Sequence, residues 1–126
     1  MAQTLRPKSL RELSRLVAEG ESFDLGLSEL LDEYYASGPE GRRRMIEEEP
    51  EALSEVENAY LAAVAEHLAY HSGLQPPEWV FSEKRFLKQP FFAARVEGLK
   101  PLLLKESPTA FRRRMIFVSG NALSRA

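Results

Sequence analysis

Two histidines four residues apart come nearest to a metal-binding motif in this sequence. His67 and His71, in the stretch HLAYH, fall on one face of a helix, as two zinc ligands do. A zincin-type helix needs a glutamate directly after the first histidine, but that position is Leu68. With no other histidine and no cysteine in the chain, a third ligand would have to be a carboxylate. We therefore expect two ordinary histidines near a helix C-terminus, and no metal.

The sequence carries no motif for nucleophilic or nucleotide chemistry. No serine lies in a G-x-S-x-G or S-x-x-K pattern, and there is no G-x-G-x-x-G or Walker A stretch. The lack of cysteine excludes thiol catalysis. The carboxylates show no pattern of an acid–base pair and are typical of solvated helix faces. We therefore predict a protein that is not an enzyme, with no catalytic residue and no cofactor.

Two arginine triplets, residues 42–44 and 112–114, could contact phosphate groups or an acidic protein surface. Because successive helical residues turn by about 100°, three adjacent side chains cannot form one stripe, and at least one should turn inward. Residues 67–126 are basic, with 10 Lys/Arg and 4 Asp/Glu, whereas residues 1–66 have 7 and 15. The two halves could therefore attract each other within one fold or face different partners.

Aromatic residues gather in the same basic half, at Trp79, Phe81, Phe86, Phe91 and Phe92. Most should anchor a proline-rich part of the core, and any that reach the surface would be hot spots for a protein partner. Stacked on bases beside the arginines, the same rings would instead suit a nucleic acid. The pI near 5.8 makes nucleic-acid binding the alternative rather than the first interpretation.

The elements that must position these groups are mainly helical. Apolar residues at three- and four-residue intervals predict helices over residues 9–18, 24–37, 39–49 and 51–72. Asp24 is the expected N-cap of the second helix, and Pro39 the first residue of the third. Ser54 and Glu57 have the spacing of a capping box at the start of the longest helix.

After Gly73 the sequence is dense in proline and aromatic residues, and its apolar residues follow no single period. It predicts short helices over residues 82–88, 99–105 and 109–114, with a short strand at Ile116–Val118. A chain of 126 residues has room for one core. The sequence thus predicts a mainly α protein, a single-domain helical bundle over residues 1–126, regular in 1–73 and irregular in 74–126.

The N-terminal stretch MAQTLRPKSLRELSRL lacks the continuous apolar core of a signal peptide. No segment approaches the roughly 18 apolar residues that a membrane span needs. We expect a cytoplasmic protein with no membrane partner.

Three motifs in the second half resemble a bacterial protein family. They are GLQPPEWV, RFLKQPFF and the terminal ESPTAFRRRMIFVSGNALSRA, and the likeness covers residues 55–126. In that family the same segments also occur behind an N-terminal helix-turn-helix, as the second half of predicted antitoxins of toxin–antitoxin systems. Its small members pair with a nucleotidyltransferase-like partner. The resemblance implies an antitoxin-like protein that binds such a partner, with no catalytic duty for any residue.

The family motifs carry over to positions Trp79, Phe86, Pro90, Phe91, Arg112, Arg113, Arg114, Phe117 and Asn121. From these and the neighbouring ring we predict the partner-binding residues Trp79, Phe86, Phe91, Phe92, Arg112, Arg113 and Arg114. The chain departs from the family at Met115 and Gly120, where asparagine and alanine are expected. It also lacks a convincing helix-turn-helix in residues 1–50, because LGLSELLDEYY is acidic where a recognition helix is basic and polar.

Overall fold

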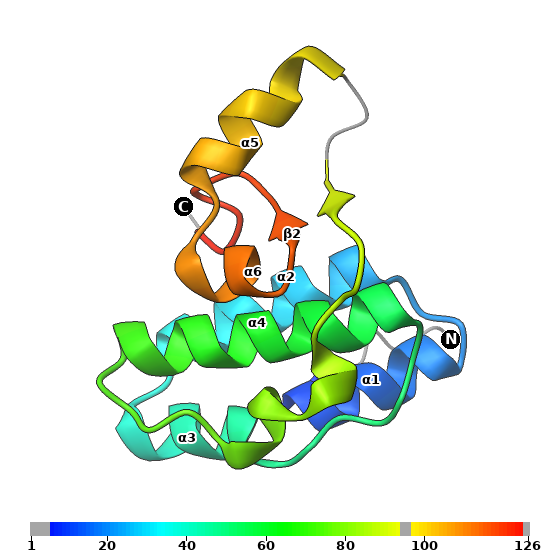
Figure 1. Cartoon of the computed structure of the whole chain (residues 1–126). Coiled ribbons are helices and arrows are strands. Elements are labelled where there is room, and N and C mark those ends of the chain that lie inside the picture. Colours follow the sequence, from blue (N-terminus) through cyan, green and yellow to red (C-terminus); the bar gives the residue numbers. More distant parts are fainter. Residues whose placement is uncertain (1–5, 94–96, 125–126) are drawn as a thin grey trace. The chain divides into compact units, whose positions relative to one another are not determined.

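The computed structural model describes residues 6–93 and 97–124 of the chain. It is mainly helical, as predicted, and its residues form two compact units, one up to Leu53 and one from Ser54 onward (Figure 1). The prediction of a single domain over residues 1–126 stays a prediction. The long helix that was expected to close the regular half belongs to the second unit, together with the proline-rich segment.

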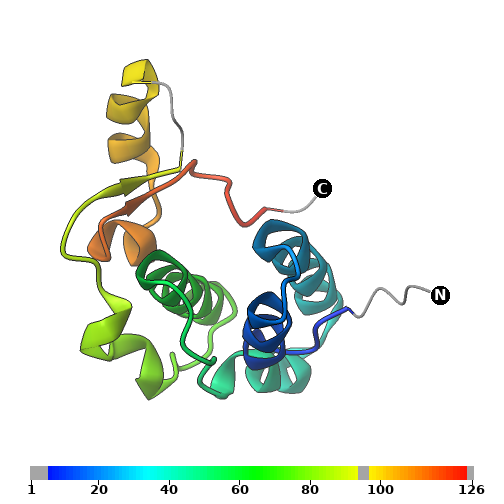
Figure 2. The ribbon, with the colours of Figure 1, turned by 90° about the vertical axis from the view of Figure 1, so that its right-hand side faces the viewer.

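The first unit contains α1 (Leu10–Ala18), α2 (Phe23–Ala36) and α3 (Pro39–Glu47), and each of them contacts the other two. Figure 2 shows α1 and α2 side by side. The Ser9 hydroxyl accepts the Glu12 N–H at 3.0 Å and so caps α1. The buried faces of α1 and α2 are formed by leucines at helical spacing: Leu10, Leu13, Leu16, Leu27, Leu30 and Leu31.

The N-cap of α2 is Ser22, so the prediction of Asp24 was wrong. The Ser22 hydroxyl accepts the Leu25 N–H at 3.1 Å, and the helix therefore begins at Phe23. Asp24 lies in the first turn instead, where the helix dipole favours a negative charge.

The helix α4 (Glu55–His71) is central to the second unit and contacts α6 (Thr109–Arg113) and two 3₁₀ turns, η1 (Glu78–Phe81) and η2 (Glu83–Arg85). Its predicted capping box is confirmed: the Ser54 hydroxyl accepts the Glu57 N–H at 3.2 Å, and the Ser54 N–H donates to Glu57 Oε1 at 3.3 Å. Small side chains are buried along it, which allows neighbouring elements to approach closely.

Among the described residues, no helix is long and apolar enough to cross a membrane.

Two 3₁₀ turns, η1 (Glu78–Phe81) and η2 (Glu83–Arg85), replace the single helix that was predicted over residues 82–88. Ser82 lies between them with an extended backbone, φ −62° and ψ 141°, which interrupts any continuous helix. The second turn ends on Arg85, whose side chain is fully buried. The prediction of one helix over residues 82–88 treated charged residues such as Arg85 as solvent-exposed, and the buried position of Arg85 does not fit that assumption.

A two-stranded parallel ladder joins β1 (Phe91–Phe92) to β2 (Ile116–Phe117), with Phe91 opposite Ile116. The strand predicted near the C-terminus is thereby confirmed over its first two residues. Parallel strands need a crossover connection. Here the described part of the crossover contains η3 (Glu97–Leu99), α5 (Lys100–Glu106) and α6 (Thr109–Arg113). Figure 1 shows α5 projecting from the rest of the second unit.

Met115, between α6 and β2, has a φ of 62°, which is the left-handed region. Its carbonyl accepts the Phe91 N–H at 2.9 Å, so the pairing of β1 with β2 begins directly at this turn. Asparagine, the residue expected from the family resemblance, tolerates this conformation better than methionine, and valine tolerates it worst.

We expect Met115→Asn to raise the free energy of unfolding by about 0.5–1 kcal/mol, and Met115→Val to lower it by about 1 kcal/mol or more. Urea unfolding curves of the three proteins give both values. If Met115→Val were more stable than Met115→Asn, backbone strain at this position would not be the controlling effect.

Candidate functional site

The predicted partner-binding residues all lie in the second unit, but their exposure differs. Exposed are Phe91, Arg112 and Arg113; half-buried are Phe86 and Phe92; buried are Trp79 and Arg114. Arg114 is 0% exposed and Trp79 is 9% exposed. As a correction to the prediction, these two side chains contact the interior of the unit, and the surface is left to the other five.

Arg114 is the centre of a buried polar cluster. Its Nη1 donates to Glu66 Oε1 at 2.6 Å and to the Ala110 carbonyl at 2.9 Å, and its Nη2 donates to the Val80 carbonyl at 2.7 Å. Its guanidinium carbon lies 4.5 Å from the centre of the Phe86 ring. Burial lowers the pKa of Arg114, and the hydrogen bond and charge of Glu66 oppose that shift. The cluster thus joins α4, η1 and α6.

Glu66 is a fully buried carboxylate that sequence reasoning did not single out. Besides Arg114 it contacts Arg113, whose Nη1 lies 3.1 Å from Glu66 Oε2. That contact is an ion pair without hydrogen-bond alignment, since no described residue donates a hydrogen bond to Oε2. One interior carboxylate therefore faces two guanidinium groups. The Arg113 side chain is 43% exposed, so it reaches from the surface to the interior.

A second buried arginine covers Trp79. The Arg85 Nη1 donates to the Asn58 carbonyl at 3.2 Å, and its guanidinium carbon lies 4.9 Å from the centre of the indole. This is the geometry of a cation–π contact. The indole that was predicted as a partner hot spot is therefore part of the packing between α4 and the two 3₁₀ turns.

Arg112 hydrogen-bonds backbone carbonyls close to it in the sequence. Its Nη2 donates to the Ser107 carbonyl at 2.8 Å and to the Lys105 carbonyl at 3.1 Å, at the C-terminal end of α5. The three arginines of the second triplet thus have three different environments. The prediction that at least one member turns inward is confirmed by Arg114.

Large apolar side chains are exposed on and beside α5. Leu99, Leu102 and Leu104, called the exposed leucines below, are 43%, 50% and 47% exposed, whereas Leu103 is 6% exposed. Because successive residues turn by about 100°, burying the middle leucine leaves its two neighbours outside. Leu99 and Leu102, three residues apart, lie on one side. Sequence reasoning did not select these leucines, although the LLL run contained the signal.

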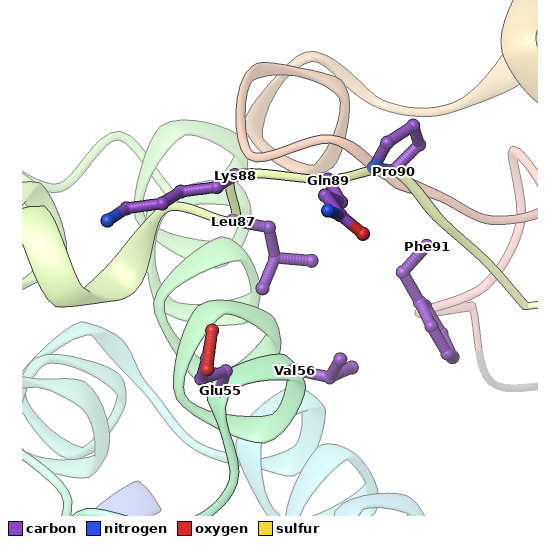
Figure 3. Close-up of a pocket in the computed structure, with 7 residues that line it drawn as sticks. All are labelled: Glu55, Val56, Leu87, Lys88, Gln89, Pro90 and Phe91. Atoms are coloured by element: carbon purple, nitrogen blue, oxygen red, sulfur yellow. The ribbon is translucent and has the colours of Figure 1, made fainter.

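A hollow of about 570 Å³ adjoins Phe91, between the first turn of α4 and the segment 87–91 (Figure 3). Its lining residues are Glu55, Val56, Leu87, Lys88, Gln89, Pro90 and Phe91. Figure 3 shows Leu87 and Val56 turned toward the space between the two segments, and Lys88 turned away from it. Four of the lining residues are apolar and three are polar or charged.

His67 and His71 lie on one face of α4, with ring centres 4.2 Å apart and planes tilted by 36°. His67 is half-buried and faces the edge of Phe111 at 6.3 Å, whereas His71 is exposed. Burial lowers the pKa of His67, and the neighbouring charge of His71 lowers it further. Within the described part of the chain, no three histidine or carboxylate residues are grouped to hold a metal ion.

No known protein family, curated protein or solved structure matches this chain. The family resemblance of residues 55–126 and the antitoxin-like role therefore stay predictions.

Proposed function

We propose that the chain is a non-catalytic protein-interaction module of the cytoplasm, and that it binds its partner through the exposed surface of the second unit. The exposed leucines carry the proposal. One exposed leucine is ordinary, but with Leu99 and Leu102 on one side and Leu104 on another, a seven-residue helix exposes large apolar side chains over much of its surface. A helix that is apolar on most sides is normally covered.

Basic side chains border this apolar surface. Lys105 and Arg112 are exposed near the end of α5, and Lys100 lies over the Phe92 ring at 5.0 Å. An apolar centre with a basic rim fits a partner with an acidic border. The family resemblance supplies the kind of partner: a nucleotidyltransferase-like toxin, with this chain in the antitoxin-like role.

The experiment is copurification of the tagged chain from its native host, with Leu102→Glu/Leu104→Glu as the test variant. Leu25→Glu is the matched control, because Leu25 is 59% exposed but lies in the first unit. We expect a stoichiometric partner with the wild type and the control, and at least about a tenfold loss of affinity in the double variant. A wild-type chain recovered alone, or a partner retained equally by both variants, would remove the proposal.

The alternative, a nucleic-acid-binding regulator, has fewer guanidinium groups at its disposal than the sequence suggested. Arg114 is enclosed, and Arg112 donates to backbone carbonyls. Retention on DNA or RNA that weakens steeply with salt and is lost in Arg113→Gln would favour this alternative over a protein partner.

A further inference from the structure

The last turns of α4 bring together two side chains that bind metals as neutral groups. His67 and His71 stand at positions i and i+4, so both rings project from the same face of the helix. Their ring centres are 4.2 Å apart. The proposed protein-binding function makes no use of this pair.

The separation of the rings is close to what one shared ion requires. With metal–nitrogen bonds of about 2.0–2.1 Å at roughly 90–109°, two imidazoles on one ion have their ring centres about 4.5–5 Å apart. The observed 4.2 Å is a few tenths of an ångström shorter. His71 is exposed, so a small rotation of its side chain can supply that difference.

The two rings differ in how firmly they are held. His67 is half-buried against Phe111, which fixes one ligand in place before an ion arrives. His71 lies at the solvent side, where an ion and its water ligands can enter.

We propose that His67 and His71 form a two-histidine chelate for a divalent transition-metal ion. Imidazole nitrogens select zinc, nickel or copper over magnesium or calcium, which prefer oxygen ligands. The described residues group no third histidine or carboxylate around them. Water, or a side chain of another molecule, therefore completes the coordination. The ion links two successive turns at the C-terminal end of α4, and it stabilises the folded chain by mass action.

The test uses the full chain, stripped with EDTA and dialysed, with ZnCl₂ as the probe and MgCl₂ as the comparison. At about 1 mM Zn²⁺ we expect the Tm to rise by about 3 °C or more, with no rise in Mg²⁺. Zinc should also shift the ring NMR signals of both histidines. The variant His71→Asn, in which only an exposed side chain changes, should lose both effects. Glu78→Gln, an exposed carboxylate on η1, should keep them.

Three outcomes would overturn the site: no zinc-dependent shift of the two rings, an equal rise of Tm in His71→Asn, or an equal rise in Mg²⁺. The first means stacked imidazoles without affinity for metal. The other two mean that zinc acts elsewhere on the chain. None of them bears on the protein partner, whose test concerns α5.

Discussion

Glu66→Gln should lower the free energy of unfolding of the second unit by about 3–5 kcal/mol. Glutamine keeps the size of the side chain but removes the negative charge that hydrogen-bonds Arg114 in the interior. The buried guanidinium is then left without its counter-ion, and that loss costs more than the hydrogen bond alone. Trp79 is the single tryptophan and lies in this unit, so its fluorescence during urea unfolding reports the change directly.

Two further variants show that the effect belongs to the ion pair. In Glu66→Gln/Arg114→Met both buried charges are absent, and we expect at least about half of the lost stability to return. Arg113→Met removes the half-exposed arginine and should cost less than about 1 kcal/mol, since its charge is screened by water. A double variant less stable than Glu66→Gln would show that Arg114 stabilises the unit mainly through its bonds to the Ala110 and Val80 carbonyls.

The second large effect is expected from Phe111→Ala, which should also lower the free energy of unfolding of the second unit by about 3–5 kcal/mol. Phe111 is a residue of α6, is 0% exposed, and packs where α6 contacts α4. Its ring meets the Tyr60 ring edge-on at 5.1 Å and the His67 ring at 6.3 Å. Truncation to alanine removes the buried ring and leaves a cavity where α6 contacts α4.

Phe81 is the matched control, because it is also in the second unit but 47% exposed. Phe81→Ala should change the free energy of unfolding by less than about 1 kcal/mol in the same assay. Equal losses in the two alanine variants would mean that α6 is not an integral part of the packing of this unit.

Local signals in the sequence predicted the helices well. Caps and periodicity involve residues a few positions apart, so Ser9, Pro39 and the Ser54–Glu57 capping box mark helix starts without knowledge of the fold. The error at Asp24 is of the same local kind, because Ser22 offered a competing cap two residues earlier. The mainly helical class followed from these short-range patterns.

The interior charges could not be predicted in the same way. Glu66 and Arg114 are separated by 48 positions, and only the tertiary fold shows that they meet. The sequence did contain a weak signal that Glu66 is buried, because it follows Ala59 and Ala62 at helical spacing on the buried face of α4. Residue type misled the interpretation, since a glutamate on a helix is normally taken as solvated.

Two of the predicted partner-binding residues, Trp79 and Arg114, are buried for a related reason, and the binding role of the other five stays a prediction. Trp79 and Arg114 have the residue types of interface hot spots, and the same properties make them good interior groups when a cation–π contact or a buried carboxylate is available. Sequence alone does not distinguish these two uses. The exposed leucines were missed because apolar residues are assigned to the core by default.

The pairing of Phe91 with Ile116 brings two distant points of the chain together as neighbours. The excursion between β1 and β2, which contains α5, therefore begins and ends at neighbouring points of the second unit. The same excursion also contains α6, whose buried Phe111 packs toward α4, whereas Leu99, Leu102 and Leu104 are exposed and can be exchanged without opening this core. The proposed recognition and the packing of the core therefore depend on different side chains of this excursion, so the exposed leucines can change while the core stays the same.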